Sequence, residues 1–437
     1  MNGNEFTPLR PNTANDRFTH SLPGPDDIVR VRLPNDIVVL SRANFNSPSV
    51  FISGLLQVGS LLDPDSKIGL ADFTASALMR GSENRSFQEI YYLLESSGAS
   101  LGIGSSAHST RFNGKALVED LDMLLNLLGE VLQFPIFPLD QVELLRAQLL
   151  TSLAMRAQDT GEMAALSFDE VIYAHHPYSR PEEGYQETVK AIQQADLIEF
   201  HRTHYGPRGM LFSIVGGVDP AMAVEQVEKV FTGWRNPGQI ALPSLPDLSP
   251  LTETSTKRVN IPGKYQTDIV VGVPGPPRTS PDFLVASLGN DVLGQFGMMG
   301  RIGKAIRENA GLAYYAASSL SGGPGPGPWD IQAGTDPEKV GRVVEMIVHE
   351  IRHFVSETIR GEELLDSQSS FIGRLPLSME SNAGVAAALI SLERYQLGLD
   401  YYQRYPDLIK SISAEEIQET ARRYLKPDQL GIGIAGP

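Results

Sequence analysis

The sequence predicts an α+β fold made of two homologous domains, each a mainly antiparallel sheet with helices on one face. The chain has 437 residues, which is too long for a single hydrophobic core. Its two halves also end alike: in residues 205–216 and again in 424–436, a Tyr and a Pro precede an apolar strand that ends in Gly. These segments lie about 220 residues apart, which indicates an internal duplication.

The first half begins with strand patterns and continues with alternating helices and strands. Residues 28–33 alternate like a strand, 34–36 read as a turn, and 37–40 return as a second strand. The elements expected after them are a strand at 50–58, helices at 69–81 and 86–96, strands at 99–105 and 109–117, helices at 119–132, 139–157, 162–174 and 195–205, and a strand at 210–217.

A Pro-rich segment at 236–258 separates the two halves and has the composition of a linker. The domains predicted are therefore a flexible tail at 1–24, an N-terminal domain at 25–235, and a C-terminal domain at 259–437. Within the last domain we expect strands at 268–273, 312–319 and 329–333, helices at 281–293, 301–309 and 340–354, and a Gly/Pro loop at 322–328.

Charge and composition exclude several kinds of partner. The net charge is −16, so a nucleic-acid-binding surface is not expected. There is no apolar run of membrane-spanning length, and without cysteine there is neither a disulfide nor a thiolate ligand. We expect a soluble cytoplasmic protein; a periplasmic one stays open if a signal segment has been removed.

The helix at 69–81 is the most informative stretch. Its apolar residues recur at helical spacing, and the opposite face carries Asp72, Ala75 and Ser76. This helix resembles the one that reads G-L-A-H-x-x-E-H-x-x-x-x-G-[ST] in the insulinase/pitrilysin-type zinc peptidases. The resemblance places Asp72 at the first zinc-binding His, Ala75 at the general-base Glu and Ser76 at the second His.

The resemblance to this family, in its shorter two-domain branch, extends over residues 25–437. Its most specific landmark is 306–314, which is similar to the family's R-E-x-x-G-L-A-Y segment. The other landmarks follow in family order: Leu33-Pro34-Asn35-Asp36, His176-Pro177-Tyr178, Ile214-Val215-Gly216 and Pro274-Gly275-Pro276. The fold that this implies is two similar α+β domains forming half of a clamshell.

Zinc binding in the family also requires a Glu on a later helix. Here there is no carboxylate between Glu143 and Asp159, and the corresponding region reads Leu149-Leu150-Thr151-Ser152-Leu153. Because a catalytic zinc needs three protein ligands, we expect no metal in this chain. We expect zinc in a homologous partner subunit instead.

The family's C-terminal region supplies an Arg and a Tyr to the substrate, and Arg307 and Tyr314 match those positions. A guanidinium can hold carbonyl or carboxylate oxygens, and a phenol can donate to a developing oxyanion. The chain thus resembles the non-catalytic, Arg/Tyr-supplying subunit of a two-chain peptidase that acts on unfolded peptides. Gly311 is expected to end the helix that carries Arg307.

Two alternatives stay open. One is a scaffold homologue with no role in proteolysis. The other is an independent zincin, because His349-Glu350-Ile351-Arg352-His353 spells H-E-x-x-H, with Glu362 and Glu363 as possible third ligands. We interpret His349 and His353 as solvent-facing residues on one flank of an amphipathic helix. The loop at 322–328 is interpreted as a plain connection between strands.

Overall fold

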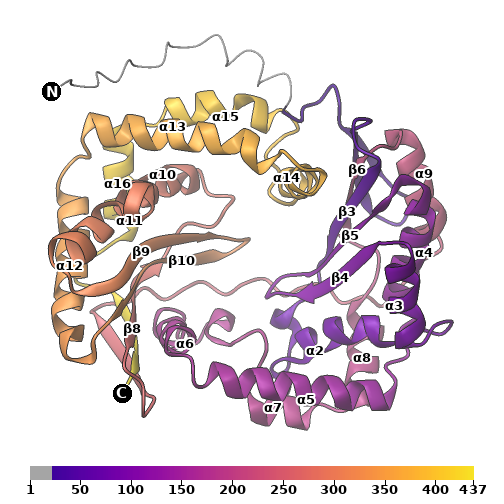
Figure 1. The fold of residues 1–437 in the computed structure, drawn as a ribbon, viewed down its shortest axis with the longest axis horizontal. Coiled ribbons are helices and arrows are strands. Elements are labelled where there is room, and N and C mark those ends of the chain that lie inside the picture. Colours follow the sequence, from indigo (N-terminus) through magenta and orange to yellow (C-terminus); the bar gives the residue numbers. More distant parts are fainter. Residues whose placement is uncertain (1–21) are drawn as a thin grey trace, which may run out of the picture.

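The computed structural model describes residues 22–437, without the side chains of Met298 and Met299. Two sheets with their helices face each other around the middle of the molecule (Figure 1). This arrangement confirms the predicted α+β fold with two similar domains. Residues 1–21 of the predicted tail lie outside the described part, but residues 22–24 are buried, so the prediction of a tail up to residue 24 was wrong at its end.

The first sheet has six strands in the order β1-β2-β6-β3-β5-β4. Their bounds are β1 Val29–Arg32, β2 Val38–Ala43, β3 Ser49–Leu56, β4 Ser100–Ser105, β5 Thr110–Leu117 and β6 Leu211–Gly216. Strands β2 and β6 run parallel, and all other neighbours run antiparallel. Strand β4 is an edge, so one row of its backbone N–H and C=O groups has no strand partner.

The second sheet has five strands in the order β7-β11-β8-β10-β9. Their bounds are β7 Ser255–Asn260, β8 Thr267–Pro274, β9 Ala313–Gly322, β10 Pro326–Thr335 and β11 Gly431–Gly436. Only β7 and β11 run parallel. This sheet repeats the order and directions of β2-β6-β3-β5-β4, which is the structural form of the duplication.

The helices of each half form an outer layer, and their apolar faces fill two large cores. In the first half they are α2 Leu70–Ala77, α3 Phe87–Ser96, α4 Leu121–Gln133, α5 Leu139–Arg156, α7 Gln186–Ala191, α8 Gln194–His204 and α9 Pro220–Phe231. In the second half they are α10 Asp282–Gly294, α11 Phe296–Gly303, the π-helical turn η6 Lys304–Asn309, α12 Val340–Ser356, α13 Gly361–Ser378, α15 Tyr401–Lys410 and α16 Ala414–Tyr424.

Two helices are exchanged between the halves. Helix α6 (Thr160–Ile172) comes from the first half but packs on β8 and β11 of the second sheet, and α14 (Asn382–Arg394) comes from the second half but packs on β3 and β6 (Figure 1). The Ser213 hydroxyl donates to the Ala386 carbonyl of α14 at 3.0 Å. The exchange places a helix on the second face of each sheet, whereas the sequence predicted helices on one face only.

The structure corrects two predicted boundaries. The irregular segment between the halves ends at Thr254, because residues 255–258 of the predicted linker belong to β7. The predicted loop at 322–328 is reduced to 323–325, since its flanks extend β9 and β10 into a long hairpin. Among the described residues no single helix has the length and apolar composition of a membrane span, although the pair α13 and α14, bent by 114°, meets that criterion jointly.

Candidate functional site

Helix α2 has the geometry of the predicted motif helix. Gly69 begins it with a φ of 98°, and a Cβ atom there would overlap the backbone of Glu183. The carboxylate of Asp63 accepts hydrogen bonds from the backbone N–H groups of Gly69 and Ala71, both at 2.8 Å. These bonds satisfy donors of the first turn that have no partner within the helix.

The three motif positions differ in exposure and charge. Ala75 is fully buried, and Asp72 and Ser76 are partly buried. Burial raises the pKa of Asp72 from 3.8 to about 7, and the carboxylates of Glu183 and Glu182 act in the same direction. The place is therefore acidic and poorly hydrated, which disfavours the charged form of Asp72.

The side chains at α2 do not fit a catalytic zinc site. Such a site takes three protein ligands with N, O or S donors, and the Ala75 methyl group also cannot act as a base. On α5, which packs against α2, Leu149 and Leu150 are apolar and the Thr151 hydroxyl donates to the Ala147 carbonyl of its own helix at 2.8 Å. Within residues 22–437 no group of three or more His, Asp or Glu side chains is placed to hold a metal ion.

Arg307 lies in the π-helical turn η6 at the end of α11. Gly311 then turns the chain with a φ of 61°, which ends the helix as the sequence predicted. The Arg307 side chain is partly buried, and it has no ion pair with any carboxylate of the described residues. Single π-helical turns are frequent at functional sites.

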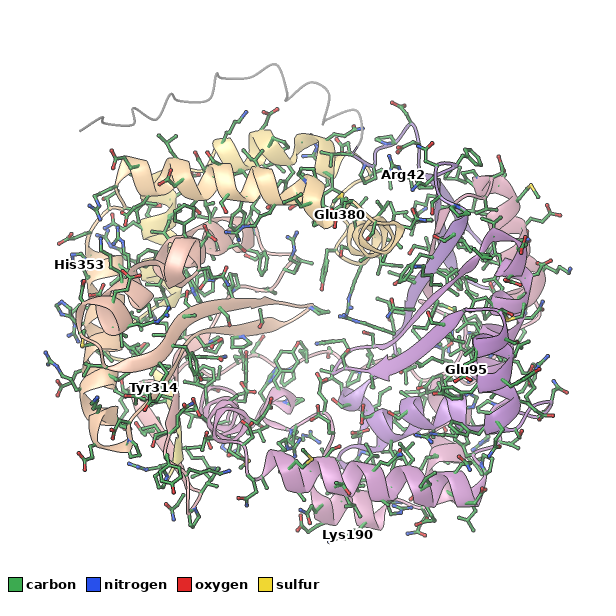
Figure 2. All side chains as sticks on the ribbon, in the orientation of Figure 1. Arg42, Glu95, Lys190, Tyr314, His353 and Glu380 are labelled. Carbon is green, nitrogen blue, oxygen red and sulfur yellow. The ribbon has the colours of Figure 1, made fainter. Side chains whose placement is uncertain are left out.

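Tyr314 lies on the edge strand β9, where the pairing with β10 slips. Gly334 pairs with Tyr315 and Thr335 pairs with Ala313, so Tyr314 is the extra residue of a β-bulge. Its side chain is 64% exposed, whereas the Tyr315 hydroxyl donates to Asp268 at 2.7 Å. Figure 2 shows Tyr314 at the end of β9 that is remote from the tip of the hairpin. A bulge redirects the side chain that it carries, and here it presents a phenol to solvent.

The tip of the β9–β10 hairpin reaches the middle of the molecule (Figure 1). The Tyr173 hydroxyl of the segment after α6 donates to the Pro326 carbonyl at 2.7 Å. The rings of Tyr173 and Tyr178 meet edge to face at 5.4 Å between centroids, and Tyr178 also forms a hydrogen bond with His108. A cavity of about 380 Å³ lies here, lined by both halves and by α6, and neither Arg307 nor Tyr314 lines it.

The H-E-x-x-H segment lies on α12, at the outer rim of the molecule (Figure 2). His349 and His353 are both exposed, and His353 Nε2 lies 2.9 Å from a carboxylate oxygen of Glu357. Of the two possible third ligands, Glu362 is exposed and Glu363 is bound to Arg301, with Nη2 and Oε2 2.6 Å apart. These contacts agree with two solvent-facing imidazoles.

Some residues near α2 and the central cavity were not identified as candidate site residues from the sequence. Asp63 had no sequence signal, because a capping Asp is expected at the N-cap itself and Gly69 holds that position here. Tyr178 was noted only as part of the His176-Pro177-Tyr178 turn. No pattern in the sequence pointed to His108 or Arg394, because they come close together at the centre only through the exchange of α14.

The sequence matches two family models along most of its length. Residues 38–181 match the one described as Insulinase (Peptidase family M16), and residues 191–371 match the one described as Peptidase M16 inactive domain. An uncharacterized zinc protease of Streptomyces coelicolor is 23% identical over 421 residues, which is 93% of this chain and 89% of that protein.

Two further matches are a solved structure with a similar fold and a relative that matches only part of the chain. The crystal structure of a peptidase M16 inactive domain from Pseudomonas fluorescens has a TM-score of 0.88 at 23% identity and covers 94% of this chain and 98% of its own. A probable mitochondrial-processing peptidase subunit beta of Arabidopsis thaliana is 25% identical over 213 residues, 49% of this chain and 40% of that protein. With both family models matched in order, this chain belongs to the M16 (insulinase) peptidase family.

Proposed function

We propose that this chain is the zinc-free subunit of a heterodimeric metallopeptidase and supplies Arg307 and Tyr314 to a partner subunit that carries the zinc site. The observation that carries the proposal is the state of α2. Its glycine start and Asp63 cap are intact, but the buried Ala75 stands where a general base is needed. Helix α2 thus keeps its capping contacts but lacks the residues that bind zinc and act as a base. This combination favours a role in assembly and substrate binding.

Arg307 and Tyr314 have chemistry that suits a peptide substrate. An unpaired guanidinium holds carbonyl or carboxylate oxygens by two parallel hydrogen bonds. A phenol can donate to the oxygen that becomes negative when the peptide carbonyl is attacked. The bulge that exposes Tyr314 supports this role, because a tyrosine needed only for packing would be buried.

The edge strand β4 supports binding of an extended peptide. It has a free row of backbone groups and it packs beside α2. Gly102 and Gly104 leave open space around the strand, since a Cβ atom at either position would meet no atom within 4 Å. An unfolded segment can add to such an edge as a further strand.

The experiment mixes the purified chain with a homologue that has an intact H-x-x-E-H motif and measures cleavage of an unfolded peptide. We expect activity only in the mixture. Tyr314→Phe should lower kcat about 100- to 1,000-fold, because one oxyanion donor is lost. Arg307→Ala should lower kcat/KM about tenfold or more.

Two matched variants serve as controls. Tyr265→Phe changes a tyrosine that is 93% exposed, and Arg342→Ala changes an exposed arginine on α12; both should leave the rate unchanged. A mixture with both Arg307→Ala and Tyr314→Phe that cleaves at the full rate contradicts the assigned roles.

A scaffold role is the second candidate, because neither Arg307 nor Tyr314 lines the central cavity of this chain. In that case the double variant still binds the zinc-bearing homologue, and neither peptide binding nor cleavage changes. The relation to a named subunit of a processing peptidase supports a peptidase partner under both candidates.

A further inference from the structure

A second cavity, of about 510 Å³, lies between the first sheet and the hairpin tip. Its wall includes Pro324 of the tip, His108 of the β4–β5 turn, and Arg394 at the end of the exchanged helix α14. It is thus formed by both halves of the chain, and it opens beside the place where Tyr178 meets His108.

The carboxylates in this wall are already paired. Glu393 accepts two hydrogen bonds from the Arg30 guanidinium, both at 2.7 Å. Asp36 accepts one from Arg32 at 3.2 Å. Neither acid is therefore left to neutralise a further cation in the cavity.

Arg394 is such a cation. It is partly buried, and no carboxylate of residues 22–437 forms an ion pair with it; its guanidinium lies 5.7 Å from the centroid of the Tyr395 ring. Burial lowers the pKa of Arg394, and Arg111 acts in the same direction. Burial and then Arg394 itself lower the pKa of His108 to about 4, so this imidazole is neutral at pH 7.

The arrangement is costly without a ligand. A charge that is removed from water without an anionic partner destabilises the fold, and charged groups in such surroundings cluster at functional sites. Arg111, opposite Gly104 in the pairing of β5 with β4, adds a second positive charge near enough to lower the pKa of Arg394. A peptide bound along the free edge of β4 therefore lies near a positively charged site.

We propose that Arg394 binds a carboxylate of the peptide held between the two halves, so that the chain selects peptides by an anionic group. This inference rests on the proposed peptide-binding function and specifies its substrate class. The carboxylate is either the peptide's C-terminus or an Asp or Glu side chain. Both have the planar pair of oxygens that a guanidinium recognises.

The test measures binding of three labelled unfolded peptides to the full chain by fluorescence anisotropy. One has a free C-terminal carboxylate and no acidic side chain, the second is its C-terminal amide, and the third is the amide with one internal Glu. We expect the first or the third to bind at least about tenfold more tightly than the second, which corresponds to a charge-assisted hydrogen bond. Which of the two binds more tightly identifies the source of the carboxylate.

The variants separate binding from folding. Arg394→Met should abolish the preference and leave the Tm unchanged or higher, because it removes a buried charge but keeps an apolar stem. Arg394→Lys should keep part of the preference, and Arg342→Gln, which removes an exposed charge on α12, should keep all of it.

Three results overturn the inference. If all three peptides bind equally, carboxylate selection is wrong and the proposed function stands. If no peptide binds at all, the proposed function fails together with it. If Arg394→Met lowers the Tm and keeps the preference, Arg394 has a structural role.

Discussion

The carboxyl group of Asp72 has an environment that disfavours its charge. Its pKa is raised from 3.8 to about 7 by burial, with Glu183 and Glu182 adding to the effect. A carboxyl group whose pKa is raised on folding binds more protons in the folded than in the unfolded chain. Stability from this group is therefore present at low pH and is lost as the pH rises from about 4 to about 7.

Asp72→Asn should accordingly stabilise the protein above pH 7. One pKa unit corresponds to about 1.4 kcal/mol, so the gain in the free energy of unfolding at pH 8 is at most about 4 kcal/mol. The gain should shrink toward zero below about pH 3, where Asp72 is protonated in both states. Thermal unfolding at both pH values measures it.

Asp247→Asn is the matched control, because Asp247 is exposed in the irregular segment between the halves. It should leave the Tm unchanged at both pH values. An Asp72→Asn variant that is less stable than the wild type at pH 8 would mean that the charged carboxylate has a stabilising partner.

At the scale of elements, the β9–β10 hairpin is the least expected feature. Its composition, rich in Gly and Pro, predicted a plain loop at 322–328, but only 323–325 lie outside the strands. The tip is held because Gly325 has no side chain: a Cβ atom there would overlap the Tyr178 hydroxyl and Leu245. The glycine at this position therefore lets the hairpin tip lie close to Tyr178 at the centre of the molecule.

Gly325→Ala should displace the hairpin tip. Overpacking of this kind costs about 1–3 kcal/mol, and we expect a lower Tm with faster proteolysis at the tip. Gly323→Ala is the control, since its Cβ atom would have only the Gly325 carbonyl oxygen nearby, at 3.8 Å. Equal behaviour of the two variants would show that the tip is not docked on Tyr178.

Elements differ in how far the sequence predicts them. Helix α12 and strand β8 were predicted within a few residues, because their apolar residues repeat at the helical or strand period. Strand β7 was missed, since nearly all its side chains are exposed and it has no apolar pattern. Helix α9 was missed although Asp219 and Pro220 form a clear start, with Asp219 accepting from Ala221 N at 2.9 Å.

At the scale of the whole molecule, the exchange of α6 and α14 joins the two halves into one structure. Helix α14 covers apolar residues of the first sheet, including Leu40 and Val215, and α6 covers Val270 and Ala435 of the second. A half without the other half's helix exposes this apolar surface to water.

We therefore expect neither half to fold alone. A chain of residues 22–250 should aggregate or bind a hydrophobic dye, and co-expression with 251–437 should restore a soluble complex with one cooperative thermal transition. A chain of residues 22–250 that is monomeric with the Tm of the full protein would contradict the structural role of α14.

The sequence by itself determined the family, the two-fold repeat of strands and helices, and the missing donors of α2, because all of these depend on residue type and spacing along the chain. Only the tertiary structure decided which helix covers which sheet, that Tyr314 is displayed by a bulge, and that Arg394 reaches the centre without an ion pair to any carboxylate of residues 22–437. These depend on contacts between residues far apart in the chain, and local periodicity carries no information about such contacts.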